Sequence, residues 1–475
     1  MMDTHEAAVA TRGRMVNECR EFSGISTDSR RITPGSLFIA LRGEHFDGHD
    51  FIHHAAAAGA AAALVDDLWA NEAAVDTPVV DPQTGKMLGF PLVVVDDTRL
   101  ALGRLAAYWR GHFNLPLVGV TGSNGKTSVK EMIAAIFRAQ SRIDGFETQD
   151  SVLATEGNLN NDIGVPLMLL RLQLAHRAAV IEMGMNHPGE IAYLSSLAKP
   201  TVALVNNAQR AHLAGVGTLA DVAEEKGAIY SGLGESGIAV VNADDAFADL
   251  WRETNRGRKV VTFGLAAGAD YSARFTTRGM VHDITLSSPY GAVSFTLAAP
   301  GVHNVRNALA AAAAAVSAGA TLEAVAEGLG QWRGVHGRLN LRDTPQGALL
   351  IDDTYNANPD SVRAGIDVLA ATPGRKILVL GDMGEIGERS AQYHDEIGGY
   401  AKSAGVDALF ALGELSELAA RNFGEHGTHF KTPEALIKAL RNELNPDATV
   451  LVKGSRFMRM ERISEALATP KKENH

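Results

Sequence analysis

The sequence has almost no cysteine, since Cys19 is the only one among 475 residues. A single thiol forms neither an intramolecular disulfide nor a thiolate metal cluster, and such a composition favours a reducing compartment. A signal peptide is also missing, because Asp3, Glu6, Arg12 and Arg14 stand where one would need an apolar core. We therefore expect a cytoplasmic protein.

Long hydrophobic runs are absent as well. Residues 55–64 and 308–316 are apolar but too short for a membrane span, and their alanine content predicts helices packed at close range. Basic residues are outnumbered, 44 against 55 acidic ones, and the net charge of −11 argues against nonspecific binding to nucleic acid or to an anionic membrane. We expect no nucleic-acid partner, no membrane insertion and a monomer.

The chain is too long for one hydrophobic core, and its length predicts three domains. The first, residues 1–114, is expected to be a small α/β domain. Residues 37–41 and 92–95 predict strands, and residues 55–64 predict a helix. Residues 66–91 contain turn residues without clear periodicity, which predicts a loop-rich excursion.

The pattern changes in residues 115–333, the predicted central domain. Short apolar runs alternate there with helical stretches, which favours a parallel sheet covered on both faces. Its predicted strands are residues 117–120, 179–182, 202–206 and 238–242. Residues 271–297 predict two or three short antiparallel strands, and a long helix is expected over residues 302–318.

A second alternating pattern fills residues 334–475. The predicted strands are residues 349–352, 377–380, 408–412 and 450–452, and the predicted helices are residues 359–371, 392–404 and 433–444. This pattern is typical of a doubly wound, Rossmann-like domain. The predicted fold class is therefore α/β, with three domains and a mononucleotide-binding domain in the middle.

A phosphate-binding loop is predicted between the first central strand and the next helix. Its residues are Thr121, Gly122, Ser123, Asn124, Gly125, Lys126, Thr127 and Ser128. Glycines let backbone N–H groups approach phosphate oxygens, Lys126 would bridge the terminal phosphates and Thr127 would ligate Mg²⁺. Val120 replaces the first glycine of the common loop, so this is a shortened variant. No Asn-Lys-x-Asp stretch indicates guanine, and ATP is the expected nucleotide.

Further motifs follow the same order as in one known family. They are residues 26–30, 38–51, 155–166, 181–191, 211–213, 225–227, 337–339, 352–359, 381–387 and 453–456. With the phosphate loop, they make the chain similar to the Mur ligase family along essentially its whole length. The main departure is the extended segment 66–91.

The resemblance implies an ATP-dependent, magnesium-requiring amide ligase of peptidoglycan precursor synthesis that acts through an acyl phosphate. The Asp-Asn-Pro-Arg signature typical of the ligase that adds the third peptide residue is absent. Residues 355–358 and 381–394 instead resemble the members that join D-alanyl-D-alanine to UDP-N-acetylmuramoyl-tripeptide. Whether the tripeptide ends in diaminopimelate or lysine stays open.

Three side chains join Lys126 as predicted catalytic groups. Glu182 follows a buried strand and is the best carboxylate for Mg²⁺; the alternative is a surface glutamate. The resemblance implies that His212 ligates a second magnesium and that Lys226 is carbamylated by CO₂ and also ligates metal. The alternatives are a helix-start histidine bonded to backbone and a solvated helix lysine. The predicted metal ligands are therefore Thr127, Glu182, His212 and Lys226.

The remaining candidate residues are assigned to substrates through the resemblance. Asn304 would contact the base, Arg338 the phosphates and Asp353 the ribose, although Asn304 also reads as a helix cap. Lys453 and Arg456 would hold the carboxylate of the dipeptide, or else form a basic surface turn. The residues implied for the UDP-sugar and its peptide arm are Asp28, Ser29, Arg30, Asp47, His49, Asn158, Asn160 and Asn161.

Two other functions compete with this hypothesis. One is another ligase of the superfamily, such as the tripeptide-forming enzyme or a folylpolyglutamate synthase. The other is a nucleotide-binding regulator that catalyses no ligation. The candidates Glu182, His212 and Lys226 argue against a regulator, because a switch needs no second metal site.

Overall fold

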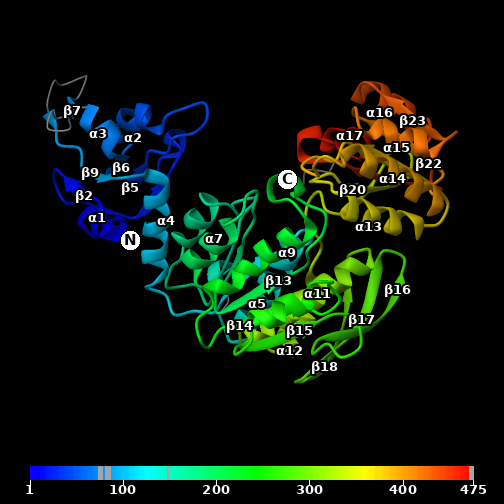
Figure 1. Ribbon diagram of the computed structural model, residues 1–475, viewed down its shortest axis with the longest axis horizontal. Coiled ribbons are helices and arrows are strands. Elements are labelled where there is room, and N and C mark those ends of the chain that lie inside the picture. Colours follow the sequence, from blue (N-terminus) through cyan, green and yellow to red (C-terminus); the bar gives the residue numbers. More distant parts are fainter. Residues whose placement is uncertain (73–78, 81–86, 147–148, 470–475) are drawn as a thin grey trace.

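The computed structural model describes residues 1–72, 79–80, 87–146 and 149–469. Three α/β regions follow one another along the chain, and the central one joins the other two (Figure 1). This arrangement agrees with the predicted fold class. The residue numbers at which one domain gives way to the next stay predictions.

The N-terminal domain is built on a five-stranded mixed sheet in the order β2-β9-β6-β5-β4. Its strands are β1 (Met2–Asp3), β2 (Arg14–Val16), β3 (Glu21–Phe22), β4 (Gly24–Ser26), β5 (Ser36–Ile39), β6 (Ala62–Asp66), β7 (Val79–Val80), β8 (Met87–Leu88) and β9 (Leu92–Val95). Its helices are α1 (Thr4–Thr11), η1 (Ser29–Arg31), η2 (Gly48–Phe51), α2 (Ile52–Ala57), α3 (Asp67–Glu72) and α4 (Thr98–Arg110). Strands β5, β6 and β9 are buried along their whole length, so this sheet is covered on both faces.

The helix predicted over residues 55–64 is wrong after Ala57. Helix α2 ends at Ala57, Gly59 takes a positive φ of 96°, and Ala62 begins β6. Strand β6 pairs with β5 on one edge and with β9 on the other. These two ladders outweigh the helix propensity of alanine, which is a weak preference that tertiary context overrides.

The loop predicted over residues 66–91 is also partly wrong. Asp66 belongs to β6, α3 follows directly, and β7 pairs antiparallel with β8. Residues 73–78 and 81–86 of that prediction lie outside the described residues. Regular structure therefore occurs in a segment whose sequence shows no periodicity.

The central domain contains a parallel six-stranded sheet in the order β11-β12-β10-β13-β14-β15. The strands are β10 (Leu117–Thr121), β11 (Val152–Ala154), β12 (Ala178–Glu182), β13 (Val202–Val205), β14 (Ile238–Asn242) and β15 (Lys259–Phe263). The strand order reverses at β10, because β11 and β12 lie on one side of it and β13 to β15 on the other. Open parallel sheets bind ligands beyond the carboxyl ends of their strands at such a reversal.

Helices cover both faces of this sheet. They are α5 (Lys126–Ile143), η3 (Gln149–Ser151), α6 (Gly164–Leu169), α7 (Glu190–Ala198), α8 (Leu213–Val216), α9 (Leu219–Gly227), η4 (Ala228–Gly232), α10 (Ala248–Thr254), α11 (Val302–Ser317) and α12 (Leu322–Gln331). Alternate residues of β10 enter opposite clusters: Leu117 packs in the core shared with α4, whereas Val118 and Val120 pack with α5 and α11. The antiparallel strands predicted over residues 271–297 are β16 (Ser272–Arg278), β17 (Val281–Ser288) and β18 (Gly291–Leu297).

The C-terminal domain has a six-stranded sheet in the order β19-β20-β24-β21-β22-β23, parallel except for β19. The strands are β19 (Asn340–Asp343), β20 (Leu349–Asp353), β21 (Arg375–Gly381), β22 (Ala408–Leu412), β23 (Gly427–Phe430) and β24 (Ala448–Lys453). The helices are α13 (Pro359–Ala370), α14 (Ser390–Ser403), α15 (Ser416–Phe423), α16 (Pro433–Arg441), η5 (Arg456–Met458) and α17 (Glu461–Leu467). Helix α13 begins where it does because Asn358 and Ser361 form a reciprocal capping box, with Pro359 in the first turn.

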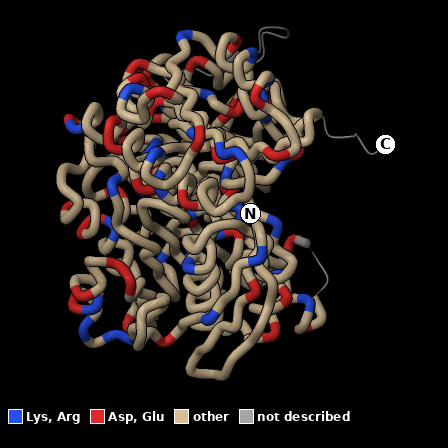
Figure 2. Tube along the Cα trace, turned by 90° about the vertical axis from the view of Figure 1, so that its right-hand side faces the viewer, with Lys and Arg blue, Asp and Glu red and all other residues tan. Residues whose placement is uncertain are grey.

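Charged residues of both signs are interspersed over the molecule in the view of Figure 2. This agrees with a sequence in which acidic residues only moderately exceed basic ones. Among the described residues, no helix is both long and apolar enough to cross a membrane.

Candidate active site

The predicted phosphate loop connects β10 to α5 at the point where the strand order reverses. Gly122 and Gly125 have φ values of 152° and 79°, which favour glycine. A Cβ atom on Gly125 would lie 2.6 Å from both Asn206 Nδ2 and Asn307 Oδ1. Both glycines are therefore needed for the loop to adopt this shape against its neighbours.

Amide side chains form hydrogen bonds with the backbone of the phosphate loop. The Asn124 N–H donates to Asn207 Oδ1 (2.8 Å), and Asn206 Nδ2 donates to the Asn124 carbonyl (2.9 Å). The Lys126 ammonium lies over the loop and donates to the Gly122 carbonyl at 2.8 Å. Burial lowers the pKa of Lys126, while the charge of Glu182 opposes that shift. A cation thus stands where the terminal phosphates of a nucleotide would need one.

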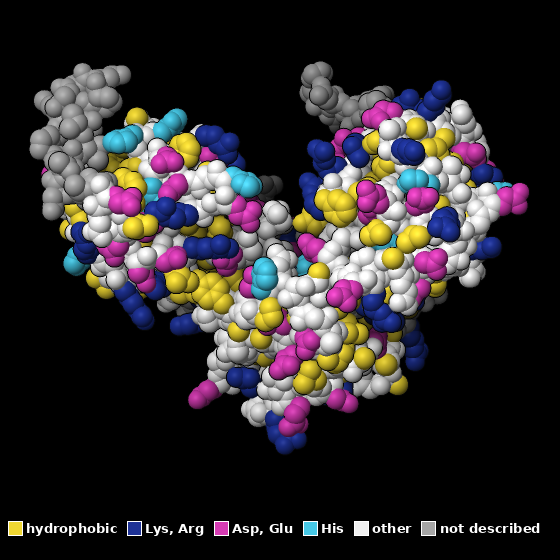
Figure 3. Space-filling model, turned by 45° about the horizontal axis from the view of Figure 1, so that its top comes forward, with side chains coloured by type: hydrophobic (Ala, Val, Ile, Leu, Met, Phe, Trp, Pro, Cys, Tyr) yellow, Lys and Arg dark blue, Asp and Glu magenta, His cyan; other side chains and the backbone are white. Residues whose placement is uncertain are grey.

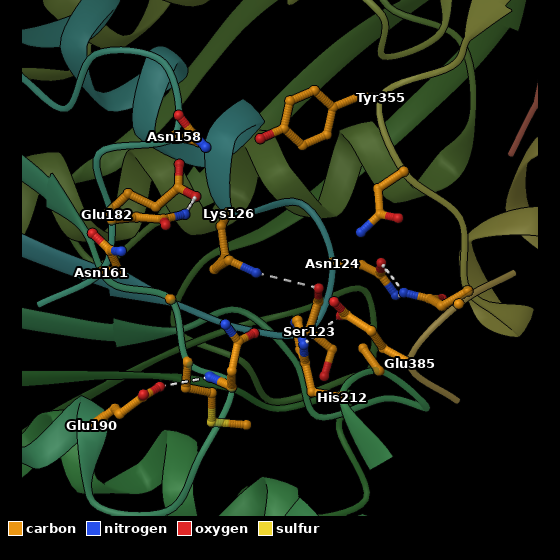
Figure 4. A pocket seen from close by; sticks show the side chains of 18 of the residues that line it. Ser123, Asn124, Lys126, Asn158, Asn161, Glu182, Glu190, His212, Tyr355 and Glu385 are labelled. Carbon is orange, nitrogen blue, oxygen red and sulfur yellow. Dashed lines mark hydrogen bonds and ion pairs between the residues drawn. The ribbon is translucent and has the colours of Figure 1, made fainter. Parts of the chain in front are cut away.

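The loop opens into a cavity of about 720 Å³ whose walls come from all three domains. The space-filling view shows the molecule hollowed between the N-terminal and C-terminal domains (Figure 3). Predicted site residues that line the cavity are Ser123, Asn124, Gly125, Lys126, Asn158, Asn160, Asn161, Glu182, His212 and Arg338. In the view of Figure 4, Lys126 lies between Glu182 on one side and His212 and Glu385 on the other. Residues far apart in the sequence are therefore brought to one site.

Glu182 ends β12 and is paired in register with Val120, just before the phosphate loop. It is 2% exposed, so the alternative of a surface glutamate is wrong. Its Oε1 accepts from Asn160 Nδ2 at 2.8 Å, and its buried Oε2 has no hydrogen-bond partner among the described residues. A buried carboxylate oxygen without a partner fits a site for a divalent cation.

His212 precedes α8 and has a positive φ of 58°. Its Nδ1 lies 3.0 Å from Glu385 Oε2, so the alternative of a histidine bonded to backbone is wrong. Burial lowers the pKa of His212, and its hydrogen bond with Glu385 opposes that shift. Thr127, the other predicted ligand near this edge, accepts from Arg338 Nη2 through its hydroxyl at 2.9 Å.

Lys226 lies near the end of α9 and is 1% exposed, so the alternative of a solvated helix lysine is wrong. Burial holds the pKa of Lys226 well below its ordinary value, and the nearby charge of Lys126 lowers it further. Its ammonium forms no ion pair with any residue that the structure describes. Such a lysine has an amine that is readily neutral.

A smaller cavity of about 80 Å³ adjoins the first through Gly125 and Arg338. Ser128, Asn304 and Asp353 also line it. Helix α11 is capped at Gly301 without a side-chain bond, so the alternative of Asn304 as helix cap is wrong. Asn304 instead donates to the Pro300 carbonyl at 2.8 Å and accepts from Asn307 at 3.1 Å.

Lys453 and Asp353 stand opposite each other at the carboxyl ends of β24 and β20. Lys453 is 2% exposed, and its Nζ donates to Asp353 Oδ2 (2.6 Å) and to the Asn356 carbonyl (3.0 Å). The alternative of a basic surface turn is therefore wrong for Lys453. It fits Arg456, whose side chain is 66% exposed and lies 3.2 Å from Glu461. Neither Lys453 nor Arg456 lines the large cavity.

The residues predicted to hold the uridine diphosphate bond mainly to one another. Asp28 accepts hydrogen bonds from the backbone N–H and the guanidinium of Arg30, with Ser29 between the two residues in the chain. The hydrogen bond from the Arg30 side chain is the main cause that lowers the pKa of Asp28 to about 2. His49 is buried, with Nδ1 at 2.6 Å from Asp47 Oδ1. None of these residues lines the large cavity, whose N-terminal wall is formed by Glu44 and Arg99.

Sequence reasoning missed the polar contacts between the central and C-terminal domains. Asp360 of α13 binds Arg210 through the guanidinium (2.5 Å) and the backbone N–H (2.9 Å), and Asn358 Nδ2 donates to Asn124 Oδ1 (2.8 Å). Glu385 lies in the Gly-rich motif 381–387, and that motif was the one available signal. Pairings this distant in sequence cannot be read from spacing.

No group of three or more His, Cys, Asp or Glu side chains placed to hold a metal ion occurs within the described part of the chain. The predicted ligand set contains only Glu182 and His212 of these types. The predicted ligand set therefore also needs the Thr127 hydroxyl and a modified Lys226 side chain to supply oxygen ligands.

Family models match three consecutive parts of the chain. "Mur ligase family, catalytic domain" matches residues 21–110, "Mur ligase middle domain" residues 120–315, and "Mur ligase, glutamate ligase domain" residues 337–456. A relative named UDP-N-acetylmuramoyl-tripeptide--D-alanyl-D-alanine ligase, from Escherichia coli (strain K12), is 44% identical over 93% of this chain and 93% of its own.

Solved structures agree with these matches. Crystal structure I of MurF from Acinetobacter baumannii superposes with a TM-score of 0.86 at 35% identity, covering 98% of both chains. MurF ligase from Thermotoga maritima in complex with ADP superposes with a TM-score of 0.76 at 29% identity, covering 93% of this chain and 96% of that one. The predicted three-domain fold and the predicted resemblance are confirmed.

Proposed function

This chain belongs to the Mur ligase family, and we propose that it is an ATP-dependent ligase that joins D-alanyl-D-alanine to UDP-N-acetylmuramoyl-tripeptide in peptidoglycan precursor synthesis. The relatives that match over almost the whole chain carry the name of this activity. We place the reaction in the cytoplasm, where ATP is available, and expect a monomer.

One observation of the structure carries the proposal. A single cavity contains the phosphate loop, the unpartnered oxygen of Glu182, the amides of residues 158–161 and Arg338 of the C-terminal domain. A ligase needs its nucleotide, its acid substrate and its amine substrate to meet at such a junction. A nucleotide switch needs only the first of these.

The reaction begins with activation of the carboxylate substrate. A carboxylate does not react with an amine at neutral pH, so its oxygen first attacks the γ-phosphorus of ATP, giving an acyl phosphate and ADP. The amine of the dipeptide then attacks the carbonyl carbon, the C–O bond to phosphate breaks, and phosphate and a proton are released. Both steps concentrate negative charge on phosphate oxygens, which Lys126 and Arg338 are placed to stabilise.

We propose that two Mg²⁺ ions bind at this site. Thr127, Glu182, His212 and an N6-carboxylated Lys226 would hold them; Mg²⁺, when bound, neutralises charge on the phosphate oxygens. The unpartnered Glu182 oxygen supports this proposal. So does the burial of Lys226, because carbamylation requires a neutral amine and leaves an anion that a metal ion can neutralise.

The substrate-binding roles follow the same division. We propose that Asn304 and Asp353, which share the smaller cavity, bind the base and ribose of ATP, and that Lys453 and Arg456 bind the dipeptide carboxylate. The uridine end of the other substrate is distant from its reacting carboxylate. Residues of the N-terminal domain outside the large cavity, such as Arg30 and His49, can therefore hold it.

The test is substrate-dependent release of ADP. Purified protein is supplied with ATP, Mg²⁺ and UDP-muramoyl-tripeptide ending in diaminopimelate or in lysine, and with D-alanyl-D-alanine, D-glutamate, diaminopimelate or lysine as the amine. We expect stoichiometric ADP and a new amide with D-alanyl-D-alanine alone. Release with another amine, or nucleotide hydrolysis without amide formation, would reject the proposal.

A further inference from the structure

The segment from Arg210 to Ala214 is held by the C-terminal domain at two places. Asp360 binds Arg210 at one end, and Glu385 binds His212 at the other through its side chain at 3.0 Å. The Glu385 carbonyl also accepts from the Ala214 N–H at 3.4 Å. Both carboxylates come from the C-terminal domain, whereas the segment belongs to the central domain.

Glu385 adopts an unusual backbone conformation for its residue type. Its φ is 61°, in the left-handed region that is unfavourable for residues other than glycine, asparagine and aspartate. Gly384 and Gly387, which tolerate such angles better, lie one and two positions away. Strained residues of this kind persist where the surrounding structure and function require them.

The contact with Glu385 decides which nitrogen of His212 carries hydrogen. The Glu385 carboxylate lies 3.0 Å from Nδ1 of His212, and a glutamate carboxylate at neutral pH has no hydrogen to donate and only accepts. Nδ1 of His212 is therefore the donor, and Nε2 keeps its lone pair. Histidines that ligate metal ions commonly donate their other N–H to a carboxylate in this way.

We propose that Glu385 is a positioning residue that fixes the Nδ1–H tautomer of His212 and thereby presents Nε2 as a ligand to the Mg²⁺–phosphate site. This inference rests on the proposed function, because it concerns the metal-binding role of His212. It also means that the histidine is oriented only while the C-terminal domain contacts the central domain. Glu385 itself needs no contact with substrate.

The neighbouring ion pair provides a matched control. Arg210 and Asp360 join the same segment to the same domain through hydrogen bonds between their own side chains. A general loss of domain docking would follow from Asp360→Asn as much as from a change at Glu385. A defect in the tautomer of His212 would follow only from the latter.

The variants separate the side chain from the backbone. Glu385→Asn suits a positive φ but is one carbon shorter, so it removes the carboxylate contact while relieving strain. Glu385→Gln keeps an acceptor oxygen at full length. We expect Glu385→Asn to lower kcat by about 10- to 100-fold with a much smaller change in KM for ATP, and Glu385→Gln to recover part of that loss.

The decisive readout does not depend on activity. Protein labelled with ¹⁵N-histidine, without metal or nucleotide, is examined by long-range ¹H–¹⁵N correlation, and the His212 signal is assigned through its loss in His212→Asn. We expect the Nδ1–H tautomer in the native protein and in Asp360→Asn, and a shift towards Nε2–H in Glu385→Asn. An unchanged tautomer, or Glu385→Asn as active as the native enzyme, would overturn the inference. Absence of ligation by the native enzyme would instead overturn the proposed function.

Discussion

Lys226 in the central domain and Lys453 in the C-terminal domain are both buried, but they differ in whether an acidic side chain pairs with them. Lys453 ends β24 and is matched by Asp353 on the adjacent strand at 2.6 Å. Lys226 is just as buried on α9, yet it has no acidic partner among the described residues, and its pKa is lowered by burial and by Lys126. Burial by itself therefore assigns no role to a lysine; the presence or absence of a partner does.

Charged groups of the large cavity and of the N-terminal domain also differ in whether they have partners. Asp28 and Arg30, and likewise Asp47 and His49, satisfy each other locally. Beside the phosphate loop, Glu182 keeps a buried oxygen that has no hydrogen-bond partner among the residues described. This oxygen of Glu182 is available to a ligand, which would offset the stability that an unpaired buried polar group costs.

The largest expected loss of activity follows from replacing Lys126, which lies in the same domain as Lys226. Lys126→Ala should lower kcat by about 10³-fold or more, because the terminal phosphates lose their fixed cation. ADP release at saturating ATP measures the loss, and the melting curve should stay unchanged. Lys402→Ala, at an exposed position on α14, is the control with native activity. Substantial turnover by Lys126→Ala would reject the phosphate-loop assignment.

Lys226 is the next test, because the comparison predicts that its amine is modified. Lys226→Arg and Lys226→Ala should both be nearly inactive, since a guanidinium stays protonated and alanine has no amine. Acetate or formate should restore part of the activity of Lys226→Ala by supplying a carboxylate in the vacated volume. The native enzyme should lose activity in mildly acidic, CO₂-free buffer and regain it with bicarbonate. Native turnover by Lys226→Arg would exclude the carbamate.

Replacement of Lys453 should lower the stability of the protein, whereas replacement of Lys226 should raise it. Lys453→Met leaves Asp353, whose side chain is 13% exposed, without its partner and should destabilise the protein by about 3 kcal/mol. Urea denaturation measures this loss, and the double variant with Asp353→Asn should recover part of it. Lys453→Met should also raise KM for D-alanyl-D-alanine more than KM for ATP. Equal changes in both constants would mean a purely structural or nucleotide-facing residue.

The smallest expected effect is the stability of Lys226→Met in CO₂-free buffer. The pKa of Lys226 is 10.5 in the unfolded chain and lies well below that value in the folded protein. At a pH between the two pKa values the amine is protonated only in the unfolded chain, so the stability of the folded protein rises with pH. Removing the amine should therefore stabilise the protein by about 1 kcal/mol near neutral pH. The difference should shrink as pH approaches 10.5. A destabilised Lys226→Met would mean that the lysine has a partner and that the contrast with Lys453 is wrong.

Most of the central domain was accessible to sequence reasoning. The strand predicted over residues 117–120 is β10, and the helix predicted over residues 302–318 is α11 within one residue at its end. Local signals sufficed because a buried strand, a glycine turn and a helix start are neighbours in sequence. The prediction over residues 55–64 was wrong where pairing with β5 and β9, which no local window contains, decided the outcome.

The candidate site was only partly accessible. The sequence indicated Lys126, Glu182, His212 and Lys226 as residue types in a known order. It did not indicate that Lys226 is buried with no ion-pair partner in the ranges that the structure describes. The contact between His212 and Glu385 joins residues of different domains and became visible only in the folded chain. The roles assigned to all these residues stay predictions until the variants are measured.

By itself, the sequence determined the phosphate loop, the alternation of strands and helices and the membership in a family, because each depends on neighbouring residues or on motifs in order. Tertiary structure alone decided which charges are satisfied. Lys453 meets an aspartate, whereas Lys226 meets no acidic partner within the described part of the chain, and this difference depends on how strands and domains pack. Electrostatic energy falls with distance and rises with burial, and both quantities exist only in three dimensions.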